Sequence, residues 1–441
     1  MQQAITLDLQ RLIDERPWSR FQLWAGTLCG AIALMDGYDA QSMGYVAPAM
    51  SADLHIARAA LGPLLSSGLA GMVIGALAFG PIADRMGRKP VLIISTLIFS
   101  LMSLATATAT TLETISLFRI LTGFGLGGAL PNTIALTSEF TPKKHRATAV
   151  TTMMCGFTLG AAFGGFVAAA LISRFGWQSV FVVGGVVPLL IAIITAAFLP
   201  ESIRFLALKR PSDKRLAHYV RKIAPGAARY DALYMGSETH KSGVFVVKEL
   251  FMEGRAKITL LLWICFFMNL MLIFFLNSWL PTVIADNGIN VRTAILITSL
   301  FQVGGTVGAI ILGWVCDRGV MSPFNMLGFV YLGAAATTIL IGQSGASIAA
   351  LIFTVTAAGF CVTGGQTASN AVAAGYYPTP IRSTGVGWCL GIGRFGSIIG
   401  PVLGGALLIS AGSHAVFWII AVPALIAMTS AFVAGRNKPR I

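Results

Sequence analysis

Two acidic residues lie three positions apart in the segment LMDGYDAQSMGYVAP at residues 34–48. Asp36 and Asp39 interrupt an otherwise apolar run, and residues three apart on a helix share roughly one face. A carboxyl group in a low-dielectric environment holds a proton more readily than it does in water. The pair therefore has the chemistry of a proton-binding site, and the sequence leaves open which carboxyl group carries the proton.

Two arginines also lie inside apolar segments, where a guanidinium is costly unless it is paired or hydrated. Arg119 lies at a depth that matches Asp36 and Asp39, so we assign all three to proton coupling. Snorkelling of Arg119 to the outer interface is the alternative. Arg394 lies far from either end of its segment. A guanidinium there suits an anionic substrate, because it can donate two parallel hydrogen bonds to a carboxylate.

The composition indicates that a membrane surrounds these residues. Of the 441 residues, 56% are hydrophobic and only 11% are charged, whereas about a quarter would be charged in a soluble protein. A helix needs roughly 20 apolar residues to cross a bilayer, and such runs recur along the chain. They cover 21–46, 59–82, 90–110, 114–138, 147–172, 177–199, 258–284, 293–316, 324–342, 347–375, 384–410 and 414–435.

Basic residues set the expected orientation of these spans. The net charge of +14 more readily reports membrane orientation than a nucleic-acid partner, because Lys and Arg collect in cytoplasmic loops. Outside the spans, only Arg58, Arg174 and Arg292 fall on the other side. We therefore expect a cytoplasmic N-terminal segment (1–20), a six-helix bundle (21–199), a cytoplasmic central loop (200–257), a second six-helix bundle (258–435) and a cytoplasmic tail (436–441).

An internal repeat supports two equivalent halves. GPIADRMGRKP at 80–90 matches GWVCDRGVMSP at 313–323 in its Gly, Asp-Arg and Pro. GAAFGG at 160–165 likewise matches GPVLGG at 400–405 in its glycines. Parallel repeats with a substrate path between them are typical of transporters of the major facilitator type.

The repeated loops could latch helices together on the cytoplasmic side, since an acid there can accept from helix N-termini and arginines. A basic loop that only sets orientation is the alternative. Glu139 and Arg146 could act as a gate or form a plain interfacial ion pair. The residues assigned to a conformational latch are Gly80, which would permit close helix approach, Asp84, Arg85, Arg88, Asp317, Arg318, Glu139 and Arg146.

Amide and aromatic side chains elsewhere in the spans suit a flat substrate. Individually, each is better explained by helix–helix packing than by a substrate contact, and only the group as a whole suggests a binding site. Besides Arg394, the residues assigned to substrate binding are Asn277, Gln302, Gln366, Asn370, Phe157 and Trp388, and Asn269 belongs to the same group of amides.

The motifs DGYD (36–39), DRMGRKP (84–90), RILTGFGLGGALPN (119–132), LPESIRFL (199–206) and GIGRFG (391–396) follow one another along nearly the whole chain. Together they resemble the bacterial aromatic acid:proton symporters of the major facilitator superfamily. The resemblance implies an all-α polytopic fold of twelve transmembrane helices in two six-helix repeats. It also implies import of benzoate- or hydroxybenzoate-type acids across the bacterial inner membrane, with Asp36 and Asp39 needed for transport. Asp84 and Asp317 match the loop acids of the two halves, although the second loop departs from the family's pattern because GVMSP lacks the basic residues of the first.

In the implied mechanism, a proton bound in the first half and a ring carboxylate bound at Arg394 together permit the two halves to rock inward. The expected partners are protons, an aromatic acid and the lipid bilayer, for a monomer without cofactor, metal or nucleic acid. The residues carry no HExxH or GxSxG motif, so no enzyme is expected. The alternatives are a symporter of dicarboxylates or sugar acids and, less favoured, a drug or metabolite antiporter.

Overall fold

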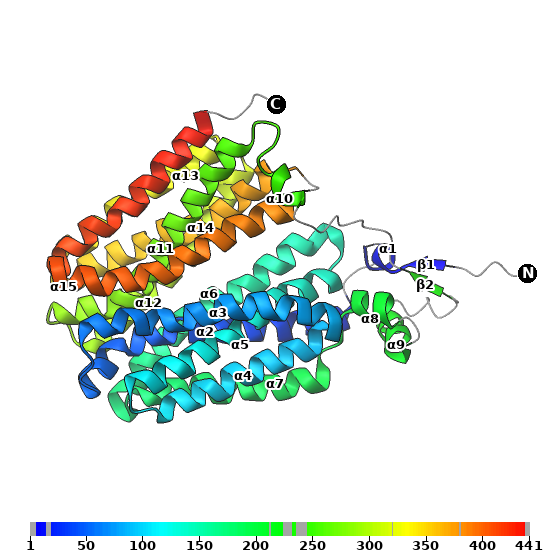
Figure 1. Ribbon diagram of the computed structural model, residues 1–441, viewed down its shortest axis with the longest axis horizontal. Helices are drawn as coiled ribbons and strands as arrows, with labels where there is room; N and C mark the ends of the chain where they lie inside the picture. Colours follow the sequence, from blue (N-terminus) through cyan, green and yellow to red (C-terminus); the bar gives the residue numbers. More distant parts are fainter. Residues whose placement is uncertain are drawn as a thin grey trace, which may run out of the picture.

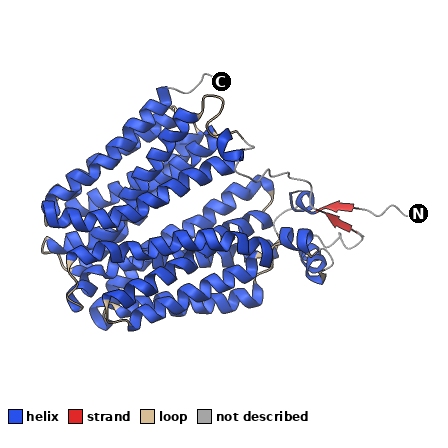
Figure 2. Ribbon diagram, viewed as in Figure 1, coloured by secondary structure: helices blue, strands red, loops and turns tan. Residues whose placement is uncertain are grey.

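The computed structural model describes residues 6–14, 19–210, 213–223, 232–234, 245–319, 321–378 and 381–436. Within these ranges nearly all regular structure is helical (Figure 2). Two three-residue strands, β1 (Thr6–Asp8) and β2 (Ala232–Tyr234), pair in parallel near the start of the chain. They add a small element to an otherwise all-α fold.

The helices fall into two sets of long elements joined by short ones. The first set is α2 (Arg20–Asp53), α3 (Arg58–Met86), α4 (Arg88–Thr108), α5 (Leu112–Phe140), α6 (Arg146–Phe175) and α7 (Gln178–Phe198). The second set is α11 (Ala256–Asp286), α12 (Val291–Asp317), α13 (Pro323–Gln343), α14 (Ile348–Tyr376) and α15 (Arg382–Arg436). The short helices are α1 (Leu9–Asp14), α8 (Ile203–Lys209), α9 (Lys214–Ile223) and α10 (Phe245–Glu249), and a 3-10 turn covers Lys143–His145.

Eleven membrane-spanning helices are found among the described residues by length and apolar composition. The element α15 supplies two of them, because Gly412 adopts a left-handed conformation (φ 77°) that breaks the helix near its middle. The helix α2 is not among the eleven, since Asp36 and Asp39 make it less apolar. The predicted all-α polytopic class is confirmed, and α2 makes the count consistent with the expected twelve.

The two sets form two bundles that meet at one end and diverge at the other (Figure 1). The diverging end carries α1, α8, α9 and both ends of the chain. Across the two bundles, α6 packs on α12, α3 on α15 and α2 on α11. These helices approach at backbone distance, because a Cβ on Gly44 would overlap the carbonyl oxygen of Asn277 and one on Gly165 would overlap Ser299.

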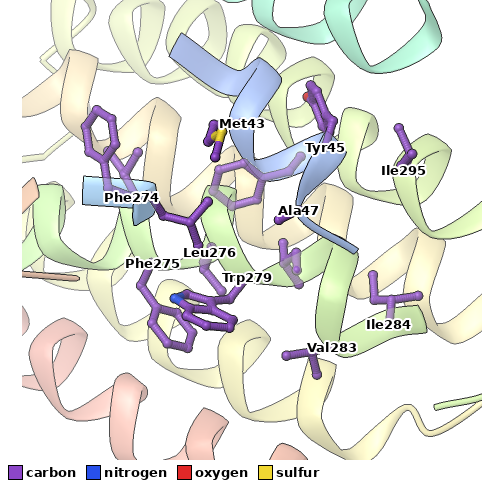
Figure 3. Packing of buried hydrophobic residues seen from close by; sticks show 14 of the residues in the cluster. Met43, Tyr45, Ala47, Phe274, Phe275, Leu276, Trp279, Val283, Ile284 and Ile295 are labelled. Atoms are coloured by element: carbon purple, nitrogen blue, oxygen red, sulfur yellow. The ribbon is translucent and has the colours of Figure 1, made fainter. Parts of the chain in front are cut away.

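The end where the bundles meet is closed by apolar packing and a few polar bonds. Figure 3 shows Met43 and Tyr45 of α2 among Phe274, Leu276 and Trp279 of α11. The ion pair between Arg58 and Asp286 also joins the bundles, with 2.8 Å between Nη2 and Oδ1.

We expect the substitution Gly44→Val to weaken this closure, since the added side chain would overlap the backbone of Asn277. Overpacking of this kind costs about 1–3 kcal/mol, enough to favour the opposite conformation up to about 100-fold. Distances between spin labels at Ala57 and Asn287, beside the closed end, would measure the shift. The matched control is Gly26→Val, because a Cβ at Gly26 on the same helix has no atom within 4 Å. Identical distance distributions in the two variants would contradict the prediction.

Candidate transport site

The acidic pair of α2 is held in place by close packing inside the first bundle. A Cβ on Gly37 would overlap the backbone carbonyl of Phe157, so α2 and α6 touch through their backbones beside the two acids. Both carboxyl groups lie in the protein interior, with Asp36 1% exposed and Asp39 fully buried. A carboxylate this deeply buried needs a partner, and the two acids differ in the partners that they have.

Asp39 forms a bidentate ion pair with Arg119 of α5. Arg119 Nη2 donates to Asp39 Oδ2 at 2.7 Å, and Nη1 donates to Oδ1 at 3.0 Å. The guanidinium also lies over the ring of Phe181, with its Cζ atom 5.4 Å from the ring centroid. Gly68 of α3 lies beside the arginine, where a Cβ would make ordinary van der Waals contact, 3.5 Å from the Arg119 carbonyl oxygen. The ion pair that the depth of Arg119 suggested is therefore present, and Arg119 does not snorkel.

Asp36 has no such partner. Both carboxyl oxygens are buried, and neither has a hydrogen-bond partner among the described residues. The carboxyl group interacts electrostatically with Arg394 of the second bundle and with Asp39. An unpaired buried carboxylate is unfavourable, so this group is best accommodated in its neutral form or with an added partner.

Arg394 reaches from α15 towards the first bundle. Among the described residues its hydrogen-bond acceptor is the sulphur of Met72 on α3, 3.3 Å from Nη1. A thioether is a weak acceptor, so most of the donor capacity of the guanidinium remains unused. Arg394 thus interacts electrostatically with Asp36 of the other bundle and keeps donors for a further anion.

The sequence-predicted amides form two separate clusters. Gln302 Nε2 donates to Asn277 Oδ1 at 3.0 Å, and both side chains are buried where α11 meets α2. Gln366 lies deeper along the same bundle, where its Oε1 accepts from Asn269 Nδ2 at 2.9 Å and its Nε2 approaches Asn370 Oδ1 at 3.5 Å. The structure therefore places Asn277 and Gln302 at the closed end and the other amides nearer to Arg394.

The predicted aromatic residues lie apart from one another. Trp388 stacks on Trp263, with ring centroids 5.7 Å apart and planes at 20°, and it remains 41% exposed. Phe157 contributes the backbone carbonyl that contacts Gly37. Their roles in binding a ring remain predictions.

The latch residues lie at the diverging end, where two of them bond to each other within the first bundle. Arg88, at the start of α4, forms an ion pair with Glu139 of α5, with 3.1 Å between Nη2 and Oε1. Glu139 thus pairs with Arg88, and no bond to Arg146 is found among the described contacts. Arg88 and Glu139 line a pocket of about 330 Å³ together with Asp84 and Ser202.

The remaining latch residues have little contact in this conformation. A Cβ on Gly80 would have no atom within 4 Å, so the close helix approach expected at this residue is not found in this conformation. Asp84 and Arg85 are exposed, and Arg318 lies over the ring of Trp314 at 4.0 Å. The Asp317 side chain lies outside the described part of the structure. The bundles diverge at this end, and no bond between them is found for the latch residues whose side chains the structure describes.

Glu201 is a structural partner that sequence reasoning missed. This buried acid follows α7 and accepts from the backbone N–H groups of Arg88 and Lys89 at 2.9 and 3.1 Å. It therefore caps α4 from a position far along the chain, as a carboxylate can at a helix N-terminus. The acid of the motif LPESIRFL was a visible signal, but nothing local in the sequence linked it to α4.

Metal chemistry finds no support in the described residues, where no three His, Cys, Asp or Glu side chains gather as a metal site requires. The features that stand out are instead a neutralisable acid and an arginine that face each other between two bundles. The sequence profile of the Major Facilitator Superfamily matches residues 29–342 and 262–440. The chain belongs to this superfamily.

Similar proteins narrow the family further. The 4-hydroxybenzoate transporter PcaK of Pseudomonas putida is 41% identical over 432 residues, which cover 98% of this chain and 96% of that protein. A gallate transporter of Pseudomonas putida is 40% identical over 435 residues, with 98% and 96% covered. The chain is thus a membrane transporter of the aromatic acid family within the major facilitator superfamily, and not an enzyme.

A solved structure agrees on the fold. A bacterial homologue of the human lysosomal transporter Spinster, in an inward-facing and occupied conformation, superposes on this transporter with a TM-score of 0.75. The match covers 96% of this chain and 98% of that one at 16% identity. At this sequence identity the likeness shows a shared arrangement of helices, and it carries no information on substrate or mechanism.

Proposed function

We propose that this transporter imports an aromatic carboxylic acid together with a proton across the bacterial inner membrane, with both termini in the cytoplasm. The observation that carries the proposal is the buried carboxyl group of Asp36. It has no hydrogen-bond partner among the described residues and faces Arg394 across the two bundles. A proton on Asp36 and a carboxylate on Arg394 would neutralise both groups at once.

The different roles that we propose for Asp36 and Asp39 follow from their contacts. Asp39 is already neutralised by Arg119 within its own bundle, so it holds the site in shape. Asp36 is the carboxyl group whose charge no neighbour satisfies, so it is the proton carrier. Arg394 is the docking point for the substrate carboxylate, because the one acceptor found for its donors among the described residues is the weak Met72 sulphur.

In the proposed transport cycle, the two bundles would reorient only when the charges of Asp36 and Arg394 are compensated. With Lys and Arg on the cytoplasmic side, the closed end around Arg58 and Asp286 faces the periplasm, and the diverging end faces the cytoplasm. The conformation is then inward-facing. Reorientation with only the proton or only the carboxylate bound would leave Arg394 or Asp36 without a compensating charge, which is costly. Reorientation with both bound carries the substrate inward, and reorientation with neither bound, when Asp36 and Arg394 compensate each other, returns the empty transporter to the outward-facing state. The latch around Arg88 and Glu139 would bias the same equilibrium from the cytoplasmic side.

Uptake into proteoliposomes tests the proposed function. We expect labelled 4-hydroxybenzoate to enter faster when the outside is made acidic, and unlabelled benzoate to compete better than succinate or gluconate. Protein-free liposomes give the passive entry of the neutral acid. Entry that ignores the imposed proton gradient would refute proton coupling. Stronger competition by succinate or gluconate would favour the non-aromatic alternatives.

A further inference from the structure

The amide of Asn269 has an unusual combination of a fixed orientation and an unused acceptor. Its Nδ2 donates to Gln366 Oε1 at 2.9 Å and to the backbone carbonyl of Val362 at 3.2 Å. Its Oδ1 is buried and has no hydrogen-bond partner among the described residues. The donor side accounts for helix–helix packing between α11 and α14. The unpaired oxygen is not explained by packing, because a buried acceptor without a donor is unfavourable.

Asn269 lies on α11, which packs against α15 beside Arg394. A Cβ on Gly393 would lie 3.2 Å from the carbonyl oxygen of Phe266, so α15 and α11 touch beside the arginine. Both helices run in the same direction at this point, and Asn269 follows Phe266 by about 4.5 Å along the helix axis at 1.5 Å per residue. Arg394 and Asn269 therefore lie at neighbouring levels on two helices that touch each other.

Asn269 also lies at the depth of the proton-binding acid. Gly44 of α2 contacts Asn277 of α11. Asp36 precedes Gly44, and Asn269 precedes Asn277, by the same number of residues. Because both helices run towards the closed end, Asp36 and Asn269 lie at a similar level. The cluster also extends to Gln366, which is partly exposed, so it is not sealed inside the second bundle.

We infer that Asn269, oriented by Gln366, accepts a hydrogen bond from a ring hydroxyl of the substrate while Arg394 holds the carboxylate. This inference rests on the proposed function and specifies its substrate class as hydroxylated ring acids. The orientation matters, since Nδ2 is already used and only an acceptor faces the ligand. A site that accepts from a hydroxyl discriminates against analogues that lack it, because its buried acceptor would stay unpaired.

Competition experiments in proteoliposomes test the inference with the wild-type transporter first. We expect 4-hydroxybenzoate and 4-aminobenzoate, which carry a donor, to inhibit labelled 4-hydroxybenzoate uptake at concentrations at least about tenfold lower than 4-methoxybenzoate or benzoate. The methoxy group has similar reach but cannot donate. Equal inhibition by the donor and methoxy compounds would overturn the inference, and this arm needs no substitution that could disturb folding.

The substitution Asn269→Leu provides the second arm. It should reduce the preference for 4-hydroxybenzoate over benzoate about tenfold while leaving inhibition by benzoate nearly unchanged. The control is Asn132→Leu, which removes a buried amide of the first bundle whose Nδ2 donates to the backbone of its own helix at Gly128. Equal losses for both acids in the Asn269 variant would assign the amide to packing alone and overturn the inference. Absence of any ring-acid uptake by the wild type would instead refute the proposed function.

Discussion

The substitution Asp36→Asn is expected to abolish proton-driven accumulation of an aromatic acid while leaving exchange across the membrane intact. An amide has nearly the shape of a protonated carboxyl group, so the variant mimics the permanently protonated carrier. A gradient of two pH units would drive about 100-fold accumulation with one coupled proton, at about 1.4 kcal/mol per unit. The variant should lose this driving force entirely, because its side chain can neither take up nor release a proton.

Two assays in the same proteoliposomes separate these effects. Uptake under an acidic exterior measures accumulation, and counterflow with substrate on both sides at equal pH measures exchange. The matched control is Asp53→Asn on the same helix, where the carboxyl group accepts from Trp177 Nε1 at 2.9 Å near the closed end. We expect this control to accumulate substrate as the wild type does. Retained uphill uptake by Asp36→Asn would remove Asp36 from the coupling mechanism.

The substitution Arg119→Met is expected to destabilise the folded transporter by about 3–5 kcal/mol, because it leaves the fully buried Asp39 carboxylate without its partner. Replacing both members should cost much less, since no uncompensated charge then remains. The double variant Asp39→Leu with Arg119→Met should therefore recover most of the lost stability. Denaturant unfolding in detergent, compared across the wild type, both single variants and the double variant, measures this coupling.

Additive losses in that cycle would show that the two side chains do not stabilise each other. Transport by the double variant answers a second question. Proton-driven uptake that survives would assign Asp39 and Arg119 a structural role, in line with the closed geometry of the pair. Loss of coupling in a well-folded double variant would return them to the proton pathway, as the sequence first indicated.

Most of the fold follows from the sequence because a membrane imposes length and polarity on every span. Even the break in α15 at Gly412 matches the gap expected between the last two spans. The partners of the charged residues follow less well. Asp36 and Asp39 share roughly one face of a helix, yet only Asp39 points at Arg119. That choice depends on the rotation of α2 against α5, which close contacts such as Gly37 with Phe157 determine.

The long-range partners of the charged residues at the diverging end could not be predicted from local sequence spacing, for the same reason. Glu139 lies close in sequence to Arg146, but its ion pair is with Arg88 from another helix. Glu201 caps α4 although α5, α6 and α7 lie between them along the chain. Local spacing predicts neighbours on one helix, whereas these contacts depend on how α4, α5 and the end of α7 pack together.

Asp36 and the amide cluster of Asn269 and Gln366 lie in different bundles, and this has a consequence for the evolution and engineering of the transporter. Asp36, Asp39 and Arg119 all belong to the first bundle, whereas Asn269 and Gln366 belong to the second. Each group keeps its internal hydrogen bonds when the bundles move as rigid bodies. Under the proposed function, variation in α11 and α14 would therefore change which ring substituents are accepted and leave proton coupling unchanged. A library confined to those two helices is the natural starting point for new substrates.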